Sequence, residues 1–172
     1  MSFVRKSVKA GVRKIWGWLH EDERNPSHEI PFDNRYEWLR ASYRKLKENP
    51  VCAKKPEYIW GVLQGAALGK VLGYERISVI EFGVAGGRGL LAMEQAAEMV
   101  ERIMGGIQID VYGFDAGKGL PKPLDYRDLP NLFFDGQYSM DRNQLERRLR
   151  RAQLELGLVE HTIPLFLDSN PA

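Results

Sequence analysis

A short apolar run followed at once by a glycine-rich turn constrains this chain more than any other feature. Residues 77–82 read Ile-Ser-Val-Ile-Glu-Phe, a β-branched segment typical of a strand covered on both faces. Residues 90–103 then repeat apolar side chains at helical spacing and place Glu94 on the outward face. Between these two segments stand glycines, at positions 83, 86, 87 and 89. We therefore predict a strand, a tight turn and a helix that ends at Gly105.

The segments that follow extend this pattern. Residues 107–115 predict a second strand, which a long loop rich in glycine and proline follows. Asp141 predicts the start of a helix over residues 141–156, because Gln144 completes a capping-box pattern. Residues 161–166 predict a third strand. An alternation of strands and helices in this order predicts an α/β fold with a doubly wound, Rossmann-like parallel sheet.

Two helices are expected ahead of the first strand, over residues 36–46 and 56–72. Residues 21–35 contain two prolines and no periodicity, so we place the main boundary of the chain there. The expected organisation is an N-terminal segment of residues 1–35, followed by a domain of residues 36–172.

The N-terminal segment is basic and amphipathic. Residues 1–20 carry five Lys and Arg side chains and no acid, with apolar side chains at helical spacing. Two interpretations stay open: this helix packs on the domain or on a partner chain, or it lies on an anionic membrane surface. No apolar run in the sequence approaches the ~20 residues that span a bilayer. The one cysteine, Cys52, fits a reducing cytoplasm, where we expect the protein.

Two acids accompany the glycine turn. Asp115 closes the second strand, where a carboxylate can accept hydrogen bonds from both hydroxyls of a ribose. Glu81 stands inside the otherwise apolar first strand, where burial of an unpaired carboxylate is costly. A cationic ligand group would compensate that charge: S-adenosylmethionine offers an ammonium and a sulfonium, whereas NAD offers an anionic pyrophosphate. The glycines also spell G-x-x-G-x-x-G rather than the G-x-G-x-x-G of dinucleotide sites.

The segment from Glu81 to Gly87 resembles the first motif of class I S-adenosylmethionine-dependent methyltransferases, E-x-G-x-G-x-G. Ala85 takes the place of the middle glycine, and alanine is tolerable there if its φ is negative. More narrowly, residues 79–171 resemble the macrocin O-methyltransferase (TylF-like) family. Four blocks in order carry this resemblance: 79–84 with Gly86-Gly87, 111–115 with 119–121, 136–139 and 166–171.

That resemblance implies a cofactor site for S-adenosylmethionine. Glu81, Gly83 and Gly87 would hold the amino-acid end of the cofactor, and Asp115 its ribose. The full set of implied cofactor-binding residues comes from the glycine turn, the second strand end and the fourth block: Glu81, Gly83, Ala85, Gly86, Gly87, Asp115 and Asp168. The implied function is an O-methyltransferase whose acceptor is a hydroxyl of a sugar or other small metabolite.

In that family the catalytic parts, an acid-rich strand and a magnesium site, follow the fourth block, and the sequence stops just after it. We therefore expect the cofactor-binding half of the enzyme, truncated after the third strand. Its catalytic residues are unknown, it has no metal ligand to name, and any Mg²⁺ would be held by residues absent from this chain. The first strand would then be an uncovered apolar sheet edge, which favours a homo-oligomer.

Two other functions stay open. One is a nicotinamide-dependent oxidoreductase, and the other is a non-catalytic module attached to a membrane surface or a partner through residues 1–20. Nucleic acid is not an expected partner. The arginines at 147, 148, 150 and 151 fall on the outward face of the predicted 141–156 helix, and no aromatic side chains stand between them to stack bases.

Overall fold

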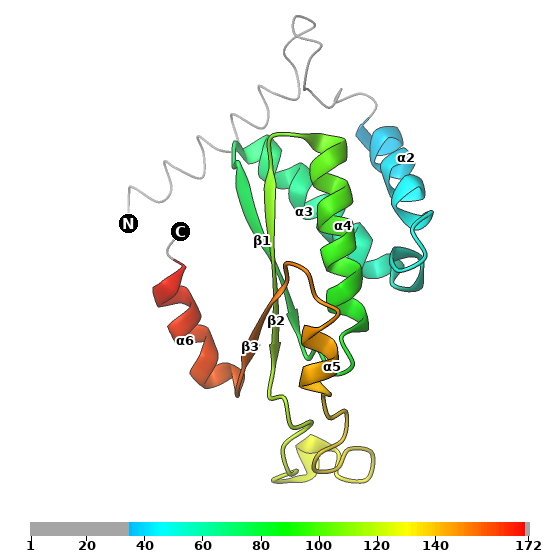
Figure 1. The fold of residues 1–172 in the computed structure, drawn as a ribbon. Coiled ribbons are helices and arrows are strands. Elements are labelled where there is room, and N and C mark those ends of the chain that lie inside the picture. Colours follow the sequence, from blue (N-terminus) through cyan, green and yellow to red (C-terminus); the bar gives the residue numbers. More distant parts are fainter. Residues whose placement is uncertain (1–34, 171–172) are drawn as a thin grey trace, which may run out of the picture.

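The computed structural model describes residues 35–170, and a three-stranded parallel sheet forms its centre (Figure 1). The strands stand in the order β1 (Arg76–Phe82), β2 (Gln108–Asp115) and β3 (Gln153–Leu156). Because they are parallel, all three end at the same edge of the sheet. The helical segments are α2 (Arg35–Lys47), η2 (Cys52–Lys54), α3 (Pro56–Leu72), α4 (Arg88–Met104), η3 (Tyr126–Asp128), α5 (Arg142–Glu146) and α6 (Val159–Ser169).

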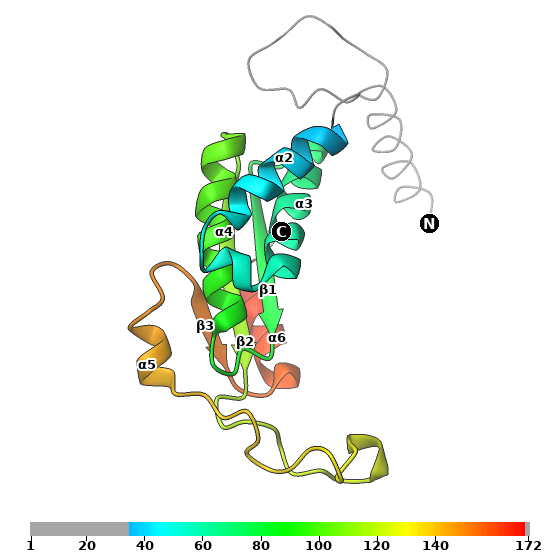
Figure 2. The same ribbon diagram turned by 90° about the vertical axis from the view of Figure 1, so that its right-hand side faces the viewer.

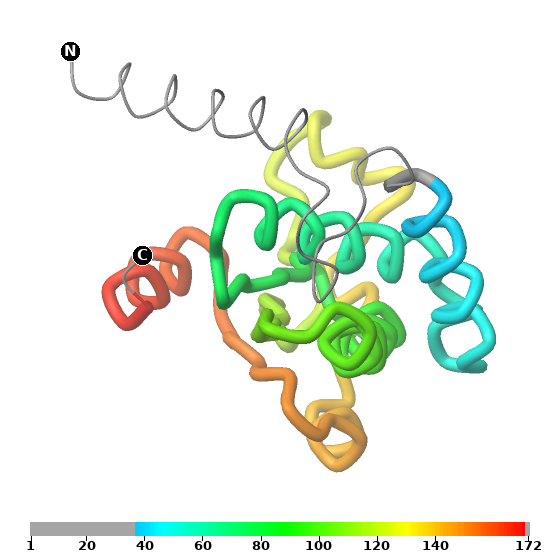
Figure 3. Tube along the Cα trace, turned by 90° about the horizontal axis from the view of Figure 1, so that it is seen from above, coloured from blue at the N-terminus to red at the C-terminus, as the bar shows by residue number. Residues whose placement is uncertain are grey.

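Helices lie on both faces of the sheet. α3 and α4 pack on one face, with α2 outside them, and α6 lies on the other face (Figures 2 and 3). The change of face after β3 is what makes the sheet doubly wound. The predicted α/β, Rossmann-like fold class with helices ahead of the first strand is therefore confirmed.

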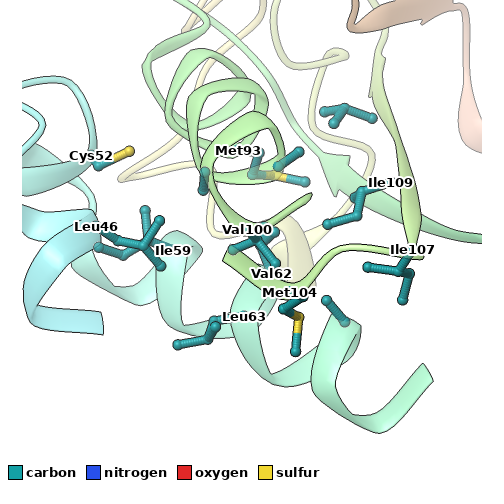
Figure 4. Close-up of a cluster of buried hydrophobic side chains, with 14 of the residues drawn as sticks. Leu46, Cys52, Ile59, Val62, Leu63, Met93, Val100, Met104, Ile107 and Ile109 are labelled. Atoms are coloured by element: carbon teal, nitrogen blue, oxygen red, sulfur yellow. The ribbon is translucent and has the colours of Figure 1, made fainter. Parts of the chain in front are cut away.

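The main core lies between the sheet and the helices on the α4 side. Figure 4 shows its side chains, which come from α2, η2, α3, α4, β2 and the residue before β2: Leu46, Cys52, Ile59, Val62, Leu63, Met93, Val100, Met104, Ile107 and Ile109. Burial raises the pKa of the Cys52 thiol to about 11, so it stays protonated and behaves as an apolar side chain. A smaller cluster on the other face joins Phe166 of α6 to Tyr112 and Phe114 of β2.

Most elements with strong periodicity form where the sequence predicts them. The two leading helices, the first two strands and the helix after the glycine turn are confirmed. α3 ends at Gly73, which has a φ of 83° and donates its amide hydrogen to the carbonyls of Gly69 and Lys70. α4 ends at Gly105, whose amide donates to Glu101 O.

The predicted helix over residues 141–156 is wrong beyond its first turn. Asp141 does cap a helix, since it accepts a hydrogen bond from Gln144 N at 2.9 Å, but α5 ends at Glu146. Glu94 explains the change, because its Oε2 accepts the amides of Arg150, Arg151 and Ala152 at 2.8 to 2.9 Å. These amides are thereby withdrawn from a helix, and the next residues pair with β2 as a strand. Glu94 is 2% exposed, so its predicted outward position is wrong as well.

Arg151 also differs from its predicted position. It was expected on an outward helix face, yet its guanidinium is only partly exposed and lies 2.7 Å from both carboxylate oxygens of Glu101. The same group donates to Ile109 O at 2.6 Å. This hydrogen bonding holds the pKa of Glu101 below its usual value. The chain before β3 is therefore fastened to α4 by two buried or partly buried acids.

The predicted third strand over residues 161–166 is also wrong, because that segment lies within α6. Ile163 and Phe166 are one helical turn apart and both pack against β2, which a strand could not achieve with this spacing. Pro164 lies inside α6. Proline is unfavourable in a helix interior, so its presence in the sequence favours an extended chain there. The third strand of the sheet is instead β3, which follows residues 116–152.

Within residues 35–170, β1 is covered on one face only, which contradicts the expectation of burial on both faces. Along this strand Ile80 is 37% and Phe82 is 57% exposed, while Glu81 between them is buried. β1 pairs with β2 on one side, and its other edge has no strand partner among residues 35–170. The expected uncovered edge is thus present in the described part of the chain. None of the helices described is long and apolar enough to cross a membrane.

Candidate functional site

The glycine turn lies at the edge where the strands end (Figure 1). Residues 83–87 lead from β1 into α4, and Gly83 N donates to Phe114 O at 2.8 Å. Gly83 and Gly87 have φ values of 82° and 74°, in the left-handed region that glycine enters without steric cost. Gly87 N donates to Val84 O at 2.8 Å and closes the turn. The backbone therefore reverses direction directly beside the end of β2.

Glu81 is the buried acid at this edge. It is 7% exposed, and its Oε2 makes no hydrogen bond within the described residues. Burial raises the pKa of Glu81 above its usual value, while hydrogen bonding from the Tyr58 hydroxyl, the charge of Lys55 and hydrogen bonding from the Leu90 amide act in the opposite direction. A buried carboxylate oxygen without a partner is costly, so this position favours a ligand that brings a donor or a positive charge.

Gly89 makes room for this acid. A Cβ atom at position 89 would lie 2.1 Å from Oε1 of Glu81 and 2.6 Å from the nearest ring atom of Tyr58. Any side chain at this position would displace Glu81 or Tyr58. The close approach of α4 to the end of β1 thus depends on glycine here.

Asp115 connects the turn to the end of β2. It is 9% exposed, its Oδ2 accepts Ala85 N at 2.9 Å, and its Oδ1 accepts Gly117 N at 2.6 Å. Its backbone carbonyl accepts Gly157 N at 2.9 Å, which ties β3 to the same edge. A carboxylate offers about four acceptor positions, so capacity remains for the hydroxyls of a ligand. The predicted turn residues and Asp115 therefore lie together.

Ala85 has a φ of 45°, so the condition of a negative φ is not met. In this conformation the Ala85 amide donates a hydrogen bond to Oδ2 of Asp115 at 2.9 Å. For a residue with a Cβ atom that conformation costs about 1–2 kcal/mol. The hydrogen bond to a buried carboxylate offsets this cost.

We expect Ala85→Gly to leave the free energy of unfolding unchanged or to raise it by up to about 1 kcal/mol. Glycine removes about 1–2 kcal/mol of strain and adds about 0.5–1 kcal/mol of chain entropy to the unfolded state. Ala41→Gly, at an exposed position in the middle of α2, is the control and should lose about 1 kcal/mol. Urea unfolding measures both, and equal losses at the two positions would contradict the strained conformation.

A cavity of about 650 Å³ adjoins Asp115, within the roughly 300–1,000 Å³ of typical ligand pockets. Its lining comes from the segments after β2 and β3 and from two charged residues of the connection between them: Ala116, Gly117, Lys118, Gly119, Leu120, Pro121, Asp135, Arg142, Leu156, Gly157 and Leu158. Residues 83–87 do not line it. Asp115 joins the two regions, because it bonds both Ala85 and Gly117.

Sequence reasoning missed part of this lining. Leu156–Leu158 lie at the cavity because β3 ends there, and interpreting residues 153–156 as helix concealed this. Leu154 and Leu156 alternate with polar residues, which is a signal for a strand. For Arg142 and Asp135 no comparable sequence signal exists, because only the path of the loop brings them together.

The connection between β2 and β3 extends away from the sheet at this edge (Figures 1 and 2, yellow). η3 within it is capped by Asp125, whose side chain accepts Arg127 N at 2.8 Å. Six large apolar side chains of this connection are exposed: Leu124, Tyr126, Leu129, Leu132, Phe134 and Tyr138. A surface of this kind at the edge of a cavity can contact an apolar part of a ligand.

Asp168 does not join the other predicted residues. It is exposed on the last turn of α6, which starts beside the end of β3 and runs back along the sheet. The prediction assumed a strand over residues 161–166, and a strand would have delivered Asp168 to the site edge. The helix instead carries it toward the opposite end of the sheet (Figure 1).

The arrangement fits S-adenosylmethionine on two observations from the structure. Oε2 of Glu81 is a buried acceptor that lacks a partner in the described part of the chain. At Gly83 and Gly86 a Cβ atom would meet no described atom within 4 Å, so the turn borders open space. For a metal ion, by contrast, residues 35–170 contain no group of three acidic, His or Cys side chains that could hold one.

Comparisons with known proteins give one match. No protein-family model matches the sequence, and no curated protein does. Among solved structures, that of CalS11, a calicheamicin methyltransferase, matches at 20% sequence identity with a TM-score of 0.48, over 88% of this chain and 68% of that chain. At this level the likeness extends to the general course of the chain and no further.

Proposed function

We propose that this chain binds S-adenosylmethionine and carries the cofactor site of an O-methyltransferase that acts on a hydroxyl of a sugar or other small metabolite. The observation that supports the proposal best is Glu81, a buried carboxylate beside a glycine turn with an oxygen that has no hydrogen-bond partner among residues 35–170. Asp115, which fastens that turn to β2, supplies the second acid.

Each part of the proposed site has its own task. Glu81 would accept the ammonium group of the cofactor, because the charge compensates a buried carboxylate. The turn at Gly83 and Gly86 would let the backbone approach the ligand closely. Asp115 would accept the ribose hydroxyls, and the cavity beyond Gly117 would take the adenine.

The charges at this edge favour this cofactor over a dinucleotide. A pyrophosphate beside Glu81 would add negative charge to a carboxylate that is already short of partners. S-adenosylmethionine brings positive charge to the same place. Glu81 therefore separates the two classes of cofactor on electrostatic grounds.

Bound S-adenosylmethionine would supply a methyl group activated for transfer to an oxygen by in-line displacement. The residues of this chain would bind and orient it, which is a large part of catalysis when two reactants must align. The exposed apolar residues of the 122–138 connection would contact the acceptor, since they lie on the same edge as the cavity.

The test is calorimetric titration of S-adenosylmethionine and, separately, of NADH into the chain. We expect saturable binding of S-adenosylmethionine, at least about tenfold weaker in Glu81→Gln and about a hundredfold weaker in Asp115→Ala. Gly86→Ala should weaken binding without changing stability, because its methyl group would occupy the open space above the turn.

Matched controls lie on the same elements. Asp110→Ala is at the other end of β2, where Asp110 pairs with Arg76, and Glu98→Gln is on the outer side of α4. Both should bind as the parent does. Binding of NADH alone, or binding of S-adenosylmethionine that survives in Asp115→Ala and Glu81→Gln, would overturn the proposal.

A further inference from the structure

Tyr58 lies beside the buried Glu81 but does not belong to the glycine turn. It lies on the first turn of α3, an element that the resemblance to methyltransferases does not assign to the cofactor. The position that a Cβ atom of residue 89 would take is 2.1 Å from Oε1 of Glu81 and 2.6 to 2.7 Å from Cε1 and Cζ of Tyr58. Oε1 of Glu81 and these two ring carbons of Tyr58 therefore surround the same point, so the two side chains lie beside each other.

The two oxygens of Glu81 thus have different surroundings. Oε1 lies beside the Tyr58 ring, while Oε2 has no hydrogen-bond partner in the described residues. The geometry points to Tyr58 as a positioning residue: its hydroxyl donates to the Glu81 carboxylate, favours the charged form, and leaves Oε2 as the acceptor for a cationic ligand group. Tyr58 acts through Glu81 and is not itself a ligand contact.

The charges around the pair agree with this role. Hydrogen bonding to Glu81 is the main reason why the pKa of Tyr58 is raised to about 12, so the hydroxyl keeps its proton at neutral pH. On the carboxylate, Lys55 also favours the charged form, whereas Asp115 opposes it. Lys55 Nζ is 5.4 Å from the centre of the Tyr58 ring, and Glu57 is the other charged group that faces Tyr58.

The consequence for pH follows from the sign of these interactions. A hydrogen bond donated to the charged form lowers the pKa of a carboxyl group, so removal of the Tyr58 hydroxyl must raise the pKa of Glu81 further. Binding of a cation requires ionised Glu81 and therefore strengthens as pH rises through that pKa. This last step rests on the proposed function, whereas the link between Tyr58 and Glu81 does not.

The experiment measures the Glu81 carboxyl directly in the ligand-free chain. The ¹³C signal of the Glu81 carboxyl, assigned by its loss in Glu81→Gln, is followed against pH by NMR. We expect Tyr58→Phe to raise the titration midpoint of Glu81. Tyr43→Phe is the control, because Tyr43 donates to Pro56 O on the same helix junction and does not face Glu81. An unchanged or lowered midpoint in Tyr58→Phe would overturn the proposal.

A reciprocal measurement, made in Glu81→Gln, does not depend on whether Tyr58→Phe folds. In Glu81→Gln the pKa of Tyr58 should fall from about 12 toward its ordinary value of 10, because the partner charge is gone. No fall would also overturn the proposal. Titration of S-adenosylmethionine then adds the functional step, with about tenfold weaker binding expected in Tyr58→Phe at neutral pH. If the midpoints move but the cofactor does not bind, the positioning role stands and the proposed function fails.

Discussion

Glu94→Ala is expected to lower the free energy of unfolding by about 3–5 kcal/mol, the loss typical of removing one partner from a buried charged network. One carboxylate oxygen accepts three consecutive backbone amides, and Glu94 is 2% exposed. The alanine variant would leave the amides of residues 150–152 without an acceptor and would release the chain before β3. Urea unfolding followed by circular dichroism measures the loss.

Two further variants define the origin of this effect. Glu94→Gln keeps an acceptor oxygen and loses the charge, so its loss should be smaller. Glu98→Ala removes a partly exposed carboxylate one turn farther along α4 that pairs with Arg102, and should change stability by less than about 0.5 kcal/mol. Amide hydrogen exchange in Glu94→Ala should rise first at residues 150–156. A loss below about 1 kcal/mol, with unchanged exchange there, would contradict the role assigned to Glu94.

The glycine turn should respond very differently at adjacent positions. Gly87→Ala is expected to cost about 2–5 kcal/mol, because about 1–2 kcal/mol of left-handed strain adds to about 1–3 kcal/mol of overpacking. A Cβ atom at this position, where φ is 74°, would lie 2.2 Å from Cδ1 of the buried Leu145. The fold, and with it the cofactor edge, should weaken in this variant.

Gly83 and Gly86 separate the two contributions. At Gly83 the φ is 82° and no described atom lies within 4 Å of a Cβ position, so Gly83→Ala should cost about 1–2 kcal/mol from strain alone. Gly86 has neither a positive φ nor a close neighbour within the described structure, and Gly86→Ala should stay within about 0.5 kcal/mol. Denaturant midpoints rank the three. In a Leu145→Ala background the cost of Gly87→Ala should shrink, and an unchanged cost would show that packing plays no part.

Elements with long, regular patterns followed from local information. α3 and α4 each present repeated apolar residues on a face, and β1 and β2 are β-branched runs bounded by glycine. In such segments the hydrophobic period and the local backbone preference agree, so the pattern alone selects the element. The local pattern also predicts Glu81 before a glycine turn and Asp115 at the end of the next strand.

Shorter segments depended on contacts from distant parts of the chain. Residues 153–156 become β3 because β2 offers hydrogen-bonding partners and Glu94 captures the preceding amides. Residues 159–169 form α6 because this helix packs the ring of Phe166 against the rings of Tyr112 and Phe114 in β2. The local pattern of residues 153–169 contains neither β2 nor Glu94, and this explains why it predicts Asp168 at the site edge.

The sequence by itself determined the order of strand, glycine turn, helix and acid, since each depends on neighbours a few residues away. Only the tertiary structure decided how that edge is built. It turned Glu94 inward, gave Ala85 a φ of 45° where its amide bonds Asp115, and placed Tyr58 beside Glu81. These outcomes join residues that are far apart along the chain, and their free energies come from burial and hydrogen bonding that exist only once the helices have packed on the sheet.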